Sequence, residues 1–143
     1  MFTNTQDGSE RLAAWRTVRN KYAGSPEELV KQFGNIKQKT RYIDYYTPEN
    51  WPTPFEIVQE GWFCPSGICL VLAATLKHLG FINSEFIRFD VISNHITGQD
   101  GLVLIDGDKC YNFMPGEIVT LDYVKENGTS FESHIIATDK FFT

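Results

Sequence analysis

The stretch from Trp62 to Gly80 reads WFCPSGICLVLAATLKHLG and decides the fold, because it predicts one buried helix. Pro65 suits the first position inside a helix, where a missing N–H has no partner to lose. Apolar residues then follow from Leu70 to Leu79, and Gly80 suits the left-handed residue that ends a helix. Because this helix is apolar nearly all round, we expect it at the centre of the domain.

The cysteine before this helix, Cys64, would lie at or next to its N-cap. Unpaired backbone N–H groups and the positive end of the helix dipole meet there, and both stabilise a thiolate. The thiolate is the form of cysteine that attacks carbonyl carbons, so Cys64 is predicted to be a nucleophile. Cys69 lies one turn inside the apolar helix and Cys110 in a strand, where we expect packing roles.

The composition predicts one globular domain over residues 1–143, with 42% apolar and 14% aromatic residues. The net charge is −5, and an acidic second half argues against nucleic acid as a partner. No signal peptide or membrane span is seen, which predicts a cytoplasmic protein without a membrane partner. Three cysteines without metal-ligand spacing predict free thiols and neither a metal nor a cofactor.

Residues 1–60 form a helical lead-in to the nucleophile helix at 61–80. Ser9 is the expected N-cap of a first helix to about Tyr22, and Ser25 caps a second. Thr53, Pro54 and Glu56 form a capping box, which predicts a short helix over residues 54–60.

Residues 81–143 change from helical to extended patterns and should form the sheet. The expected strands are residues 85–92, 95–97, 102–106, 109–114 and 132–138. Residues 118–124 fit either a strand or a short helix, and residues 98–101 are the expected turn of a hairpin. Helices first and strands afterwards indicate an α+β domain, with the central helix packed on an antiparallel β-sheet.

A cysteine nucleophile needs a nearby base, and the base needs a group that orients it. His78 would lie about 20 Å from Cys64 along the helix, at about 1.5 Å per residue, and is excluded. His95 is preferred over His134, because its hairpin should pack on the helix. With the turn at 98–101, Asp106 would share a face with His95 and could orient it. Asn112 is the reserve candidate for that role.

The motifs around Cys64 resemble those of the bacterial transglutaminase-like cysteine proteinases. Trp51-Pro52-Thr53-Pro54-Phe55-Glu56, followed by Gly61 and Cys64, is similar to that family's signature. Val30 and Tyr42-Ile43-Asp44 fit the pattern upstream, and Leu76 to Gly80, His95 and Leu104-Ile105-Asp106 match its later motifs. The similarity thus spans roughly residues 29–110. It implies a papain/transglutaminase-like fold, with Cys64 as nucleophile, His95 as general base and acid, and Asp106 as orienting group.

The chain departs from the family pattern in two ways. Phe63 and Pro65 stand where the family has acidic residues that help bind calcium, so we expect no calcium site next to Cys64. The interval from Cys64 to His95 is also shorter than is usual in the family.

The sequence therefore predicts a thiol-dependent hydrolase of peptide or isopeptide amide bonds that forms an acyl-enzyme on a protein or peptide substrate. Transglutaminase-type acyl transfer, glutamine deamidation, and a catalytically inactive binding domain on the same scaffold remain alternatives. The oligomeric state is left open.

Overall fold

The computed structural model describes residues 1–3 and 5–141 of the chain. Its helices are α1 (Gly8–Lys21), α2 (Pro26–Gly34), the 3₁₀ turn η1 (Pro48–Asn50), α3 (Pro54–Glu60), α4 (Pro65–His78), α5 (Leu121–Asn127) and α6 (Thr138–Phe141). Its strands are β1 (Phe86–Asn94), β2 (Asp100–Asp106), β3 (Lys109–Tyr111), β4 (Ile118–Thr120) and β5 (Gly128–Ala137). The strands form one antiparallel sheet in the order β4-β3-β2-β1-β5. This confirms the predicted α+β class.

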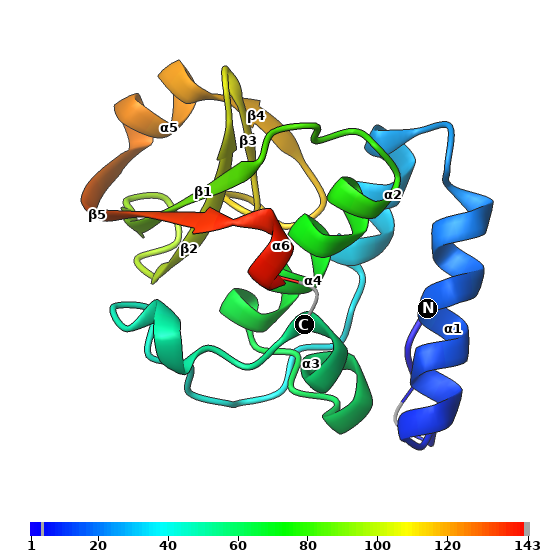
Figure 1. The fold of residues 1–143 in the computed structure, drawn as a ribbon. Helices are drawn as coiled ribbons and strands as arrows, with labels where there is room; N and C mark the ends of the chain where they lie inside the picture. Colours follow the sequence, from blue (N-terminus) through cyan, green and yellow to red (C-terminus); the bar gives the residue numbers. More distant parts are fainter. Residues whose placement is uncertain (4, 142–143) are drawn as a thin grey trace.

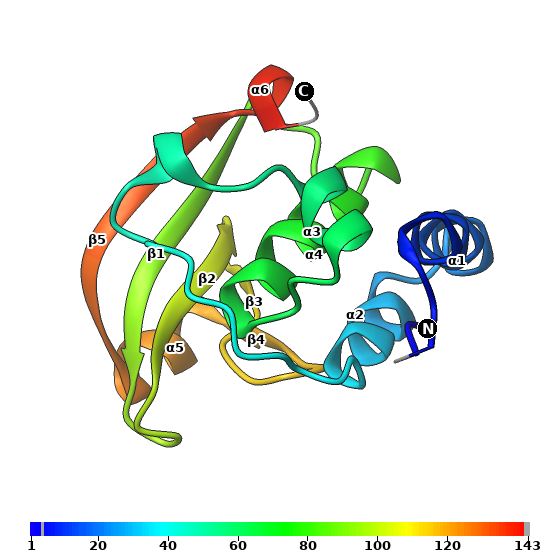
Figure 2. The ribbon, with the colours of Figure 1, turned by 90° about the horizontal axis from the view of Figure 1, so that it is seen from below.

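Helix α4 lies between the sheet and the other large helices (Figures 1 and 2). Its side chains from Cys69 to Leu76 are at most 2% exposed. Leu102 and Leu104 of β2 belong to the same apolar core. The predicted central helix is therefore confirmed, and its packing on β2 fixes where its N-terminus meets the sheet.

The local signals for the helix starts also hold, with one exception. Ser25 Oγ accepts from Glu28 N, and the capping box of Thr53 is present at α3. The N-cap of α1 is Asp7 instead of Ser9, because Asp7 forms its own capping box with Glu10. The prediction for α1 was wrong by two residues.

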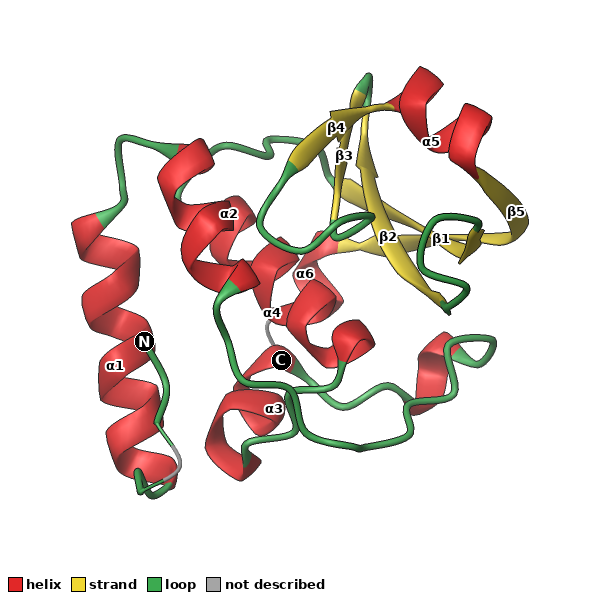
Figure 3. Cartoon of the chain, turned by 180° about the vertical axis from the view of Figure 1, so that it is seen from behind, coloured by secondary structure: helices red, strands yellow, loops and turns green. Residues whose placement is uncertain are grey.

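A strap of irregular chain, residues 35–53, joins α2 to α3 and crosses the sheet on the side of α4 (Figure 2). Lys39 N donates to Phe63 O near its start. On the opposite side of the sheet, α5 covers a second apolar cluster (Figure 3). The strap and α4 together cover the inner face of the sheet, so any site at Cys64 lies between them.

Residues 118–124, whose pattern fitted either a strand or a short helix, contain one of each. Residues 118–120 form β4, and α5 begins at Leu121. Thr120 caps α5 through its hydroxyl, which accepts from Tyr123 N.

Candidate functional site at the start of α4

Cys64 is the N-cap of α4. Its Sγ accepts a hydrogen bond from Gly67 N at 3.3 Å, and the residue is 6% exposed. Gly67 permits this tight start, because a Cβ there would lie 2.4 Å from Trp62 O. The sequence-based placement of the thiol at the N-cap is thus confirmed, whereas its accessibility is low.

Opposing effects act on the thiol. Burial raises the pKa of Cys64 above its ordinary value, and this effect is the largest. Backbone N–H groups at the helix start and the charge of Arg41 act to lower that pKa. The guanidinium of Arg41 lies 4.1 Å from the centre of the Trp62 ring. The groups at the helix start favour the thiolate form of Cys64, but burial disfavours it more strongly, so the pKa is raised overall.

His95 was predicted to lie in a strand. The structure places it in the turn after β1. It is exposed, and its Nε2 hydrogen-bonds Thr129 Oγ1 at 2.8 Å. Its backbone N–H donates to Asn127 O. Both contacts tie it to the β5 side of the sheet. Within the described residues, no hydrogen bond joins His95 to Cys64.

The predicted pairing of His95 with Asp106 is wrong, because the hairpin has another register. Ser93 pairs with Asp100 and Arg88 with Ile105, so Asp106 lies at the opposite end of β1 from His95. Seven residues separate position 95 from position 88, which is roughly 20 Å of strand. The structure does not bring Asp106 to the imidazole.

Asn112, the reserve candidate, lies close to the helix start. Its Nδ2 donates to Pro65 O and to Leu102 O, each at 3.0 Å. Its φ of 73° is in the left-handed region, which asparagine tolerates better than most residues. Because both amide donors bind backbone carbonyls, Asn112 fastens α4 to β2 and does not contact a histidine.

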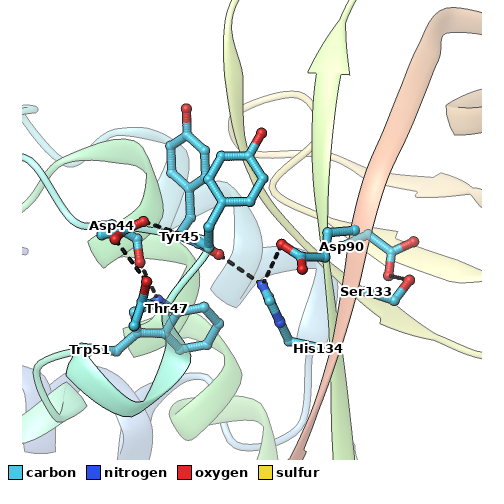
Figure 4. A network of polar contacts seen from close by, with 9 residues as sticks. Asp44, Tyr45, Thr47, Trp51, Asp90, Ser133 and His134 are labelled. Atoms are coloured by element: carbon cyan, nitrogen blue, oxygen red, sulfur yellow. Dashed lines mark hydrogen bonds and ion pairs between the residues drawn. The ribbon is translucent and has the colours of Figure 1, made fainter.

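The other two histidines also lie away from Cys64. His134 Nε2 donates to Tyr45 O at 2.9 Å, and its ring lies edge-on to Trp51 at 5.6 Å (Figure 4). Asp44 holds the same strap, since its carboxylate accepts from Thr47 Oγ1. His78 is exposed in the last turn of α4. The network in Figure 4 therefore fastens the strap to β5.

A cavity of about 100 Å³, here called the α4 cavity, lies beside the helix start. Pro65 lines it, while Cys64 is not among its described lining residues. Its polar lining consists of Gln38, Asn94, Thr97, Gln99, Asp100 and Asn112. The thiol adjoins this cavity without forming its wall.

Asp100, which was expected in the turn at residues 98–101 and in contact with solvent, is a lining residue of the cavity. It begins β2 and shares a face with Leu102, since side chains alternate along a strand. It is exposed, and its charge adds to the burial that raises the pKa of Tyr45 on the strap. Only the hairpin register could have revealed that Asp100 faces the helix side.

Within the described residues, no group of three or more histidine, cysteine, aspartate or glutamate side chains is placed to hold a metal ion. In the same part of the chain, no helix has the length and apolar character needed to cross a membrane.

The chain was compared with known proteins. No family model and no curated protein matches it. Among solved structures, calcium-bound LapG of Legionella pneumophila is similar, with a TM-score of 0.68 and 15% identity over 94% of this chain and 82% of that one. LapG and EGTA-treated LapG of the same organism each match with a TM-score of 0.67 and 15% identity, covering 94% and 95% of this chain and 80% of each of those chains. The chain therefore has the transglutaminase-like fold of LapG.

Proposed function

We propose that the domain binds a polypeptide segment at the α4 cavity and does not hydrolyse it. The observation that carries this proposal is the placement of the three histidines. His95 binds Thr129, His134 binds Tyr45 O, and His78 lies at the far end of α4. Cys64 keeps the position of a nucleophile without an imidazole in hydrogen-bond contact.

The missing contact matters because a thiol attacks an amide only as the thiolate. An imidazole base would supply that form and later protonate the leaving amine. Burial already raises the pKa of Cys64, so little thiolate is present at neutral pH without such a base. Slow chemistry at Cys64 is the expected consequence.

A polypeptide is the partner class that the scaffold and the cavity favour. LapG, whose fold this chain shares, is a cysteine protease. The α4 cavity, at about 100 Å³, is smaller than the roughly 300–1,000 Å³ of small-molecule sites. It has room for a single side chain, and the side-chain amides of Gln38 and Gln99 and the Asp100 carboxylate can hydrogen-bond a peptide backbone.

The competing proposal is hydrolysis or acyl transfer through Cys64, His95 and Asp106. It is favoured by the N-cap position of Cys64, by the Gly67 N–H and by the charge of Arg41. It requires His95 to leave Thr129 and reach the thiol. It also requires Asp106 to orient His95, although the two lie at opposite ends of β1.

Thiol reactivity separates the two proposals. Iodoacetamide labelling of the folded chain is followed from about pH 5 to pH 10, with Cys64→Ala identifying the signal of Cys64. For a binding domain, the rate rises with pH beyond about 8.5, the ordinary cysteine value. His95→Ala leaves that rate unchanged. A rate that levels off near neutral pH and falls in His95→Ala would establish the catalytic pair.

Binding is tested directly on an array of random peptides. The wild type and Cys64→Ala should retain the same peptides uncleaved, and Asp100→Lys should lose them. Asp122→Lys is the matched control, because Asp122 is an exposed acid on α5. Cleavage of retained peptides, or equal binding by Asp100→Lys, contradicts the proposal.

A further inference from the structure

The strand β5 forms an open edge of the sheet (Figures 1 and 2). Its residues 129–133 and Ile135 are exposed. Among the described parts of the chain, residues 129–137 make backbone hydrogen bonds with β1 alone. A ten-residue edge with free N–H and C=O groups is a template for another strand.

The side chains of β5 repeat symmetrically about Ser133. In an antiparallel pair of two β5 strands with Ser133 opposite Ser133, Phe131 lies opposite Ile135 of the second copy. These two side chains are 55% and 59% exposed. Glu132 lies opposite His134, whose ring is already held by Tyr45 O and lies 3.7 Å from Glu132 of its own chain, so the exposed pair of Phe131 and Ile135 carries the complementarity. Each of these contacts occurs twice, as a two-fold axis requires.

Other registers lose this complementarity. A shift that places Glu132 opposite Glu132 sets like charges against each other, which destabilises a strand pair. A shift by one residue moves every side chain to the other face of the continuous sheet. The β1 register skips Phe131, because Val91 pairs with Glu132 and Ile92 with Ser130. Its ring thus has no cross-strand partner on β1.

We propose that β5 pairs antiparallel with β5 of a second copy of this chain, with Ser133 on the two-fold axis, so that the two sheets become one. A single strand pair is smaller than the interfaces of permanent dimers. Association is therefore expected at protein concentrations on the order of 0.1 mM, and it does not involve Cys64.

The oligomeric state is measured by sedimentation equilibrium between about 0.01 and 1 mM. The wild type should approach twice the monomer mass at the upper end. Ile135→Lys should remain monomeric, because lysine there faces Phe131 of the second copy. Phe86→Lys is the matched control, since Phe86 is 55% exposed but lies on the inner neighbour strand β1. A monomeric wild type, or an Ile135→Lys variant that dimerises normally, overturns the proposal.

Cross-linking tests the register. Opposite Cα atoms in an antiparallel pair are about 4.5–5.5 Å apart, which a disulfide can span. Ser133→Cys should therefore form a disulfide-linked dimer on mild oxidation. Thr129→Cys should not, because position 129 lies opposite Ala137. The three native cysteines are buried in the folded chain. A dimer that cross-links equally through position 129, or not at all through position 133, overturns this register.

Discussion

The amide of Asn112 should hold the start of α4 against β2. Three substitutions can separate the contribution of its hydrogen bonds from that of its left-handed backbone conformation. The residue contributes two hydrogen bonds, to Pro65 O and Leu102 O, and it occupies a left-handed conformation. Asn112→Ala removes both bonds and places a less tolerant side chain at φ 73°. Asn112→Gly removes the same bonds without the conformational cost.

The expected losses follow from these contacts. Two hydrogen bonds contribute about 1–3 kcal/mol in total, at about 0.5–1.5 each. The left-handed conformation adds roughly 1 kcal/mol for alanine. Asn112→Ala should therefore lower the free energy of unfolding by about 2–4 kcal/mol, and Asn112→Gly by about 1 kcal/mol less. Asn112→Asp places an acceptor against two carbonyl oxygens, so it should be the least stable near neutral pH.

Urea denaturation followed by far-UV circular dichroism gives the unfolding free energies of the variants. If Asn112→Gly were no more stable than Asn112→Ala, the left-handed conformation would carry no cost. If Asn112→Asp matched the wild type, the two donated hydrogen bonds would not exist as described.

Three further predictions concern the same core and sheet. Gly67→Ala should destabilise the chain by about 1–3 kcal/mol in urea denaturation, because the added Cβ would meet Trp62 O at 2.4 Å. Asp90→Ala should cost about 1–3 kcal/mol by the same assay, because the buried Asp90 carboxylate binds the Arg88 guanidinium at 2.9 Å and accepts from two serines, while the Arg88 side chain left without it is 43% exposed; Asp90→Asn should cost less. Burial raises the pKa of Cys110 to about 11, so the folded chain holds that proton longer than the unfolded chain, whose thiol ionises near about 8.5. Stability should therefore fall as the pH rises from about 8.5 to 11, and Cys110→Ala should reduce that fall in denaturation curves measured across this range.

The parts of the fold that the sequence predicted correctly depend on short-range chemistry. The N-cap Cys64, Pro65 in the first turn, and the capping box of Thr53 each act over no more than four residues of chain. Such signals require no knowledge of distant partners. For this reason the start of α4, and with it the position of the thiol, could be predicted from the sequence alone.

The prediction of the hairpin was wrong because the side chain of Asn94 stabilises a turn at an earlier position. Asn94 Oδ1 accepts from Ile96 N and Thr97 N, and Asn94 O accepts from Gly98 N. This arrangement ends β1 at Asn94 and begins the turn at position 95, three residues before the predicted turn at Gly98. An asparagine that accepts hydrogen bonds from the backbone ahead of it is a known turn former, but the sequence analysis ended one strand at Ile92 and placed another at residues 95–97, so it gave Asn94 no role.

The shifted turn determines what faces the helix start. Because β1 continues to Asn94, Asp100 becomes the first residue of β2 on the face of Leu102, and His95 moves to the β5 side. The hydrogen bonds that Asn94 accepts at this turn thus help to decide that Asp100, and not His95, lines the α4 cavity. Changes to this turn should therefore alter the cavity's chemistry without altering the fold, since α4 is held by Asn112 and the apolar core, neither of which depends on the turn residues.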